Sequence, residues 1–129
     1  MHPRLPRVLG TVLVSGLLLA ACGGDGGNGA GYKPPAGPVT QRFEIESGNF
    51  YFEPDKITAS AGVTQLTLKD QSGMHTLVFD GAFPGFQLEV SGGGDEDSGK
   101  VDLQAGKYTF YCNITGHRAQ GMEGTITVK

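Results

Sequence analysis

Residues 105–128 read AGKYTFYCNITGHRAQGMEGTITV, and both ends of this stretch predict β-structure. Near its start Tyr108, Phe110 and Cys112 occupy every second position, and alternation returns at 125–128. Because side chains two apart share one face of a strand, these three residues should point together into a core. The stretch therefore predicts two strands joined by a loop that carries a thiol, an imidazole and a thioether.

The same period of two recurs upstream, from Thr40 onward. Short segments rich in valine, threonine and aromatic residues alternate with glycine-containing turns, as half-buried strands do. The further candidate strands are 43–45, 50–52, 57–59, 63–68, 75–79, 86–90 and 101–103. This pattern predicts one all-β domain over residues 39–129, a Greek-key β-sandwich or barrel of seven to eight strands.

The first 21 residues have the organisation of a secretory signal peptide. Arg4 and Arg7 give a positive start, and the apolar run 8–19 is too short for a membrane-spanning helix. The following Leu-Ala-Ala-Cys resembles a bacterial lipobox, in which Cys22 is lipidated and becomes the mature N-terminus. The alternative is an ordinary cleavage site with an incidental cysteine. We expect a lipid-anchored protein on the extracytoplasmic face of a bacterial membrane.

Residues 22–38 have the composition of a linker. Seven glycines and three prolines fall within the 16 residues 23–38, without hydrophobic periodicity. As a flexible chain this segment would reach about 20–25 Å. We predict that it tethers the β-domain to the membrane.

Charge and cysteine content exclude several classes of function. Without the signal peptide the chain keeps eight basic residues against 13 acidic ones, which is unsuited to gripping nucleic-acid phosphates. The densest acidic run, residues 95–97, is expected to be a solvated loop. Two cysteines permit at most one disulfide, and none if Cys22 carries lipid, so this is no disulfide-built scaffold.

A metal-ligand pattern lies in the loop between the last two strands. Cys112, His117 and Met122 have the spacing C-x4-H-x4-M, and His75 begins a strand 37 residues before Cys112. Thiolate, two imidazoles and a thioether form a soft ligand set, and a His2Cys site with a weak axial Met is diagnostic of blue copper. The third histidine, His2, belongs to the signal peptide. Structural zinc sites are closed Cys/His sets, and a thioether is a poor zinc ligand.

These residues resemble the cupredoxin family, the single-copper blue proteins, with ligand spacing nearest to rusticyanin and sulfocyanin. The resemblance covers residues 41–129 and includes Phe-Glu-Pro at 52–54, Gly-Met-His-Thr at 73–76 and the segment 105–112 that leads into the loop. It implies one type 1 copper ion bound by His75, Cys112, His117 and an axial Met122.

The family also implies roles for neighbouring positions. His75 should be buried, and His117 should lie near the surface, where electrons leave through an apolar patch. Phe83, Pro84, Phe86 and Ala119 are candidates for that patch, although core packing explains the phenylalanines equally well.

Two positions depart from the family pattern. Thr76 replaces the asparagine of plastocyanin and azurin, so it should keep the backbone N–H to the cysteine sulfur but join the loops differently. Arg118 places a positive charge beside His117, either to select an acidic partner or simply as a solvated side chain.

The function we predict is one-electron shuttling by a membrane-tethered copper protein, a non-enzyme and a monomer. Its partner would be a redox protein such as a cytochrome or an oxidase. The alternative is a lipoprotein that delivers or buffers copper for an oxidase, although delivery sites tend to be open and rich in methionine or histidine. A metal-free β-domain serving adhesion is the third possibility.

Overall fold

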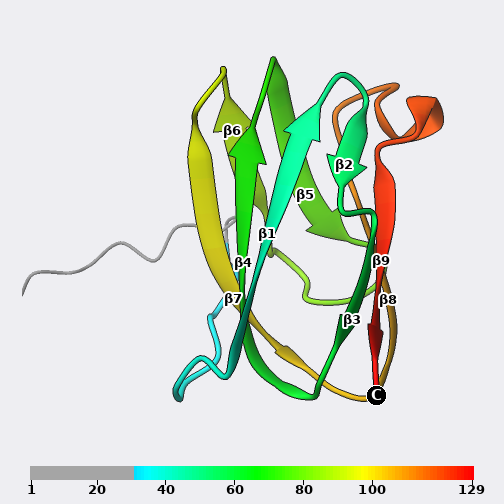
Figure 1. Cartoon of the computed structure of the whole chain (residues 1–129). Helices are drawn as coiled ribbons and strands as arrows, with labels where there is room; N and C mark the ends of the chain where they lie inside the picture. The colour runs from blue at the N-terminus through cyan, green and yellow to red at the C-terminus, as the bar shows by residue number, and fades with distance from the viewer. Residues whose placement is uncertain (1–30) are drawn as a thin grey trace, which may run out of the picture.

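The computed structural model describes residues 31–129, which form two facing β-sheets (Figure 1). The strands are β1 (Gln41–Gly48), β2 (Tyr51–Glu53), β3 (Lys56–Ala59), β4 (Gly62–Asp70), β5 (Met74–Phe79), β6 (Leu88–Ser91), β7 (Glu96–Leu103), β8 (Gly106–Tyr111) and β9 (Glu123–Val128). One 3-10 turn, η1 (Arg118–Gln120), precedes β9. Within these residues no helix has the length and apolar character of a membrane span.

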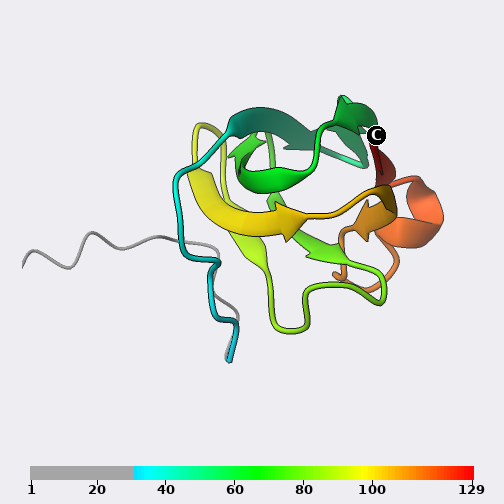
Figure 2. The same ribbon diagram turned by 90° about the horizontal axis from the view of Figure 1, so that it is seen from below.

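The two sheets are built from strands that are distant in sequence. One has the order β2-β1-β4-β7 and the other β3-β9-β8-β5-β6. β1 runs parallel to β4, and β3 runs parallel to β9, whereas the other pairs are antiparallel. Viewed along the barrel, the sheets enclose one core, and the segment before β1 runs outside them (Figure 2). The predicted all-β sandwich or barrel is confirmed.

Each of the nine candidate segments corresponds to a strand. The described residues thus contain nine strands, one more than the seven to eight given for the fold as a whole. Pro54 has no N–H to donate to a ladder, so the chain changes sheets there and leaves two short strands, β2 and β3, on either side.

Alternation along the strands fills the core between the sheets. β4 buries every second residue from Thr64 to Asp70, and Phe110 of β8 is fully buried. Gly124 on β9 leaves space for the Phe110 ring, because a Cβ at position 124 would collide with the ring and with the Asp55 carbonyl. The period of two residues thus determines which side chains form the core.

The acidic run at 95–97 is only partly the solvated loop that was predicted, since Asp95 is an exposed loop residue but the next two residues belong to a strand. Glu96 and Asp97 begin β7, and the side chain of Asp97 accepts the Glu89 N–H of β6 at 3.0 Å. Asp95 accepts the Ser91 N–H at 2.9 Å. Because β6 and β7 are edge strands of different sheets, these carboxylates use unpaired edge N–H groups and join the two edges.

The N-terminal predictions concern mostly residues that the structure does not describe. The signal peptide at 1–21, Cys22 and the linker as far as residue 30 lie outside the described range. Within the rest of the linker, Tyr32 packs its ring edge-on against Phe86 at 5.2 Å and donates its hydroxyl to the Lys100 carbonyl at 2.7 Å. The contacts of the N-terminal segment with the barrel therefore include residue 32.

Candidate metal centre

The four predicted ligand residues come from two segments at one end of the barrel, the strand β5 and the loop between β8 and β9. His75 is the second residue of β5, and Cys112 directly follows β8. His117 caps η1, and Met122 directly precedes β9. In Figure 1 the start of β5 and η1 both lie at the top, the end opposite the C-terminus.

Three of these side chains converge on one point. A ring nitrogen of His75, a ring nitrogen of His117 and the Cys112 sulfur all lie within 4.8 Å of one another. Nδ1 of His117 is 3.5 Å from Sγ of Cys112. His75 and Cys112 are fully buried, whereas His117 is half-buried, which matches the expected inner and outer histidines.

The hydrogen bonds of His75 leave one ring nitrogen facing inward without a partner. Nε2 lies 2.8 Å from the Ser72 carbonyl, which only accepts, so Nε2 carries the proton. Nδ1 is buried and has no hydrogen-bond partner, at a cost of about 1–3 kcal/mol. An unprotonated imidazole nitrogen beside a thiol and a second imidazole fits a soft transition metal such as copper.

Glycine at position 73 makes room for this histidine. Gly73 has a φ of +99°, and a Cβ there would lie 3.3 Å from His75 Nε2. Both the backbone conformation and the available space therefore disfavour a side chain directly before Met74 and His75.

Thr76 joins the Cys112 side of the site to β5. Its N–H lies 3.5 Å from the Cys112 sulfur and its hydroxyl lies 3.6 Å from the same atom. The hydroxyl also donates to Asn113 Oδ1 at 2.7 Å and accepts the Asn113 N–H at 3.0 Å. Thr76 thus retains the expected N–H to sulfur and ties the two loops through a hydroxyl.

Met122 is fully buried and is fixed through its backbone to two other members of the site. Its carbonyl accepts the Cys112 N–H at 3.1 Å, and its own N–H donates to the His117 carbonyl at 3.2 Å. These bonds close the loop 112–122 on itself. The loop residues are therefore positioned by backbone hydrogen bonds as well as by their side chains.

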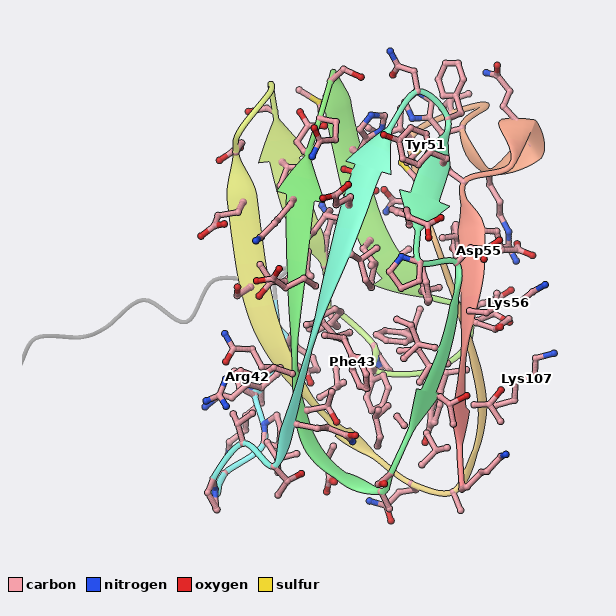
Figure 3. The ribbon with its side chains drawn as sticks, viewed as in Figure 1. Arg42, Phe43, Tyr51, Asp55, Lys56 and Lys107 are labelled. Atoms are coloured by element: carbon pink, nitrogen blue, oxygen red, sulfur yellow. The ribbon has the colours of Figure 1, made fainter. Side chains whose placement is uncertain are left out.

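Of the four residues suggested for an apolar patch beside His117, Pro84 and Ala119 are exposed, whereas the two phenylalanines are not. Phe86 is only 2% exposed, and Phe83 stacks on Tyr108 at 5.4 Å, so both belong to the core packing. Phe50, from the turn between β1 and β2, packs edge-on against His117 at 4.8 Å instead. Figure 3 shows its neighbour Tyr51 at the same end of the molecule, where it is 43% exposed.

Arg118 is engaged within the protein rather than standing alone beside His117. Its guanidinium lies 4.0 Å from the centre of the Tyr111 ring and pairs with Asp80 at 2.8 Å and with Glu123. The hydrogen bond to Asp80, followed by that to Glu123, raises the pKa of Arg118. The charge is thus matched by two carboxylates, and the side chain holds η1 against β8.

Sequence reasoning did not identify three residues around the site. Ser72 supplies only a backbone carbonyl and Phe50 comes from a distant turn, so neither carried a sequence signal that placed it at the site. Asp70 did carry a sequence signal, because it lies on the same inward-facing side of β4 as Leu66 and Leu68. A carboxylate at an inward position of a strand is uncommon and points to a polar function.

Comparison with known proteins assigns the chain to a family. Residues 39–129 match the copper binding proteins of the plastocyanin/azurin family. Plastocyanin of Dryopteris crassirhizoma is 41% identical over 98 residues, covering 65% of this chain and 93% of its own length. Plastocyanin of Nostoc punctiforme is 33% identical over 113 residues, covering 76% of this chain and 80% of its own length.

Solved structures agree with the fold. Auracyanin B superposes with a TM-score of 0.62 at 17% identity, covering 82% of this chain and 99% of its own. Auracyanin A, a blue copper protein of Chloroflexus aurantiacus, gives a TM-score of 0.56 at 16% identity, covering 72% of this chain and 100% of its own. The matching sequence family, the barrel and the converging His, Cys and His side chains lead to one conclusion. This chain belongs to the plastocyanin/azurin family of copper-binding proteins, the cupredoxins.

Proposed function

We propose that this protein is a membrane-tethered, extracytoplasmic electron carrier with one type 1 copper ion bound by His75, Cys112, His117 and an axial Met122. The observation that carries the proposal is the unpartnered, buried Nδ1 of His75 beside the thiol of Cys112 and the ring of His117. Bound copper would supply a one-electron Cu(I)/Cu(II) couple, and its thiolate bond would give intense colour.

The burial of the site favours electron transfer over catalysis on a substrate. His75, Cys112 and Met122 are fully buried, so a substrate molecule has no contact with them. His117 is half-buried and reaches the surface beside Phe50. An electron needs only this partly exposed imidazole and a close partner, and the aromatic ring next to it helps exclude water. The partner we propose is a redox protein, a cytochrome or an oxidase, and the carrier itself acts as a monomer.

The copper centre is tested on the chain from Gly23 to Lys129, which includes every described residue. We expect Cu(II) to produce an intense blue-to-green band, with reversible voltammetry, and Cys112→Ser to abolish the band. Absence of the band, or its persistence in Cys112→Ser, would contradict a type 1 site. Slow redox cycling together with ready loss of copper to a chelator would instead favour the delivery function.

The tether is tested on the full chain in a bacterial host. We expect the protein in the membrane fraction, and Cys22→Ser to move it to the soluble extracytoplasmic fraction. Cys112→Ser is the matched control, since it removes the other cysteine and should leave the protein on the membrane. Equal membrane retention of both variants would exclude Cys22 as the anchor.

A further inference from the structure

A buried carboxylate lies behind the inner histidine of the metal centre. Asp70 ends β4 and points inward, and its side chain is fully buried. A carboxylate removed from water in this way is costly unless hydrogen bonds replace its hydration. Its partners therefore show what it does in the fold.

Asp70 holds two loops at the metal-binding end. Oδ1 accepts the Ser72 N–H at 3.0 Å, and Oδ2 accepts the Gly92 N–H at 2.9 Å. Its backbone adds bonds to the β6–β7 loop, since its N–H donates to the Asp95 carbonyl and its carbonyl accepts the Gly94 N–H, both at 2.9 Å. The carboxylate is thus a fixed point to which the segment 71–73 is attached.

That segment in turn orients His75. The Ser72 residue that gives its N–H to Asp70 presents its carbonyl to His75 Nε2 at 2.8 Å. Oδ1 of Asp70 lies 4.0 Å from the same nitrogen. A carbonyl in contact and a carboxylate just behind it both favour the proton on Nε2. Partners of this kind on the far side of a ligand histidine fix its tautomer and raise its basicity.

We infer that Asp70 is a positioning residue for the metal centre: it holds Ser72 so that His75 keeps its proton on Nε2 and turns an unprotonated Nδ1 toward Cys112 and His117. Its negative charge favours Cu(II) over Cu(I), which lowers the reduction potential. The copper part of this inference rests on the proposed function, whereas the tautomer of His75 does not.

The test is Asp70→Asn in the chain from Gly23 to Lys129, with two readouts. Nitrogen-15 NMR of the metal-free protein reports which ring nitrogen of His75 is protonated. We expect Nε2–H alone in the unsubstituted protein and a mixture of tautomers in Asp70→Asn. Titration with Cu(II) should show about 10- to 100-fold weaker binding in the variant. If the substitution weakens the binding of Cu(II) but not of Cu(I), each tenfold loss of Cu(II) affinity raises the reduction potential by about 59 mV.

Asp97→Asn is the matched control. It removes the same charge and a side chain that also accepts a backbone N–H group, from Glu89, but it has no bond to Asp70 and is only half-buried. It should leave the tautomer, the Cu(II) affinity and the potential unchanged. Equal effects of both substitutions, or a folded Asp70→Asn with an unchanged tautomer and affinity, would overturn the inference.

If Asp70→Asn does not fold, the tautomer measured in the unsubstituted protein still tests the inference. A proton on Nδ1 of His75 would refute the arrangement directly. Failure of the proposed function is a separate result. It would appear as a missing blue band while the tautomer measurement still applies.

Discussion

The hydroxyl of Thr76 is joined to Asn113 by two hydrogen bonds, one donated to Oδ1 at 2.7 Å and one accepted from the N–H at 3.0 Å. A hydroxyl has one proton, and the Asn113 oxygen is much nearer than the Cys112 sulfur at 3.6 Å. The proton therefore belongs to the bond with Asn113. The sulfur keeps the Thr76 backbone N–H, which no substitution other than proline removes.

Replacing Thr76 by valine should separate these two roles. Thr76→Val removes two hydrogen bonds to Asn113, an exposed residue, so it should cost about 0.5–1.5 kcal/mol of unfolding free energy per bond in the metal-free protein. The blue band should persist, because the N–H to sulfur remains. Urea denaturation and the visible spectrum measure the two effects. Thr67→Val is the control. It removes a hydroxyl bond between Thr67 and Ser98, both in the sheet that does not contain Thr76, and it should leave the spectrum and potential unchanged. A Thr76→Val protein of unchanged stability would contradict the role given to this pair.

Substitution of Met122 should change the reduction potential of bound copper while leaving the stability of the fold nearly unchanged. Met122→Leu conserves buried volume, so we expect a stability loss below about 1.5 kcal/mol. Loss of a weakly donating thioether should favour Cu(I) and raise the potential, because the axial ligand tunes it. Voltammetry of the copper-loaded variant checks this, with Met74→Leu as the control, because Met74 is 54% exposed. Equal potentials for Met122→Leu and Met74→Leu would rule out Met122 as a ligand.

Copper should stabilise the domain, and its removal should reverse the effect. A ligand that binds only the folded state at 100 times its Kd adds about 2.7 kcal/mol. Calorimetric unfolding with and without copper, followed by chelation, measures the shift in Tm. Cys112→Ser should lose most of this shift. A Tm independent of copper in the unsubstituted protein would show that the site does not hold the ion.

Tyr32 should make stability fall at alkaline pH. Burial, and next the negative charge of Asp102, raise the pKa of Tyr32. The folded state therefore holds the phenol proton more tightly than the unfolded state, so this stabilisation is complete below about pH 10 and is lost as pH rises through the raised pKa. Lys69, whose pKa is raised mainly by its hydrogen bond to Glu44, acts in the same direction.

Tyr32→Phe isolates the contribution of Tyr32, because the variant retains Lys69 and the aromatic ring. At neutral pH the variant should be less stable by about 1 kcal/mol, through loss of the bond to the Lys100 carbonyl. The difference between the two proteins should shrink above about pH 10. Urea denaturation across this range tests the prediction, and parallel pH profiles would contradict it.

Sequence alone predicted the features that follow from local pattern. Alternation predicted the all-β fold and the inward side of Cys112, and motif spacing selected His75, Cys112 and His117, which the structure brings together. The Pro54 break was visible, but not that the strands on its two sides belong to different sheets. Local pattern gives strand faces, whereas pairing partners are decided by the whole chain.

The remaining features depend on contacts between distant segments. Phe50 reaches His117 from a turn 67 positions away, and Tyr32 reaches the Lys100 carbonyl with 68 positions between them. Alternation placed Phe50 in a strand but could not show that it reaches His117, and Tyr32 is a single aromatic in a glycine- and proline-rich stretch with no periodicity. For the acidic run at 95–97, charge density predicted only exposure to solvent. It did not reveal that the carboxylates accept unpaired N–H groups at a strand edge.

The position of Tyr32 has a consequence for how the protein meets its partner. Its two contacts, Phe86 and the Lys100 carbonyl, lie along the flank of the barrel, whereas His117 lies at the end beside η1. Under the tether proposed at Cys22, a domain held by its flank would lie lengthwise on the membrane, with the His117 end pointing sideways along that surface. The proposed redox partner, if embedded in the same membrane, would then be approached by lateral diffusion, and the search for it would take place in two dimensions.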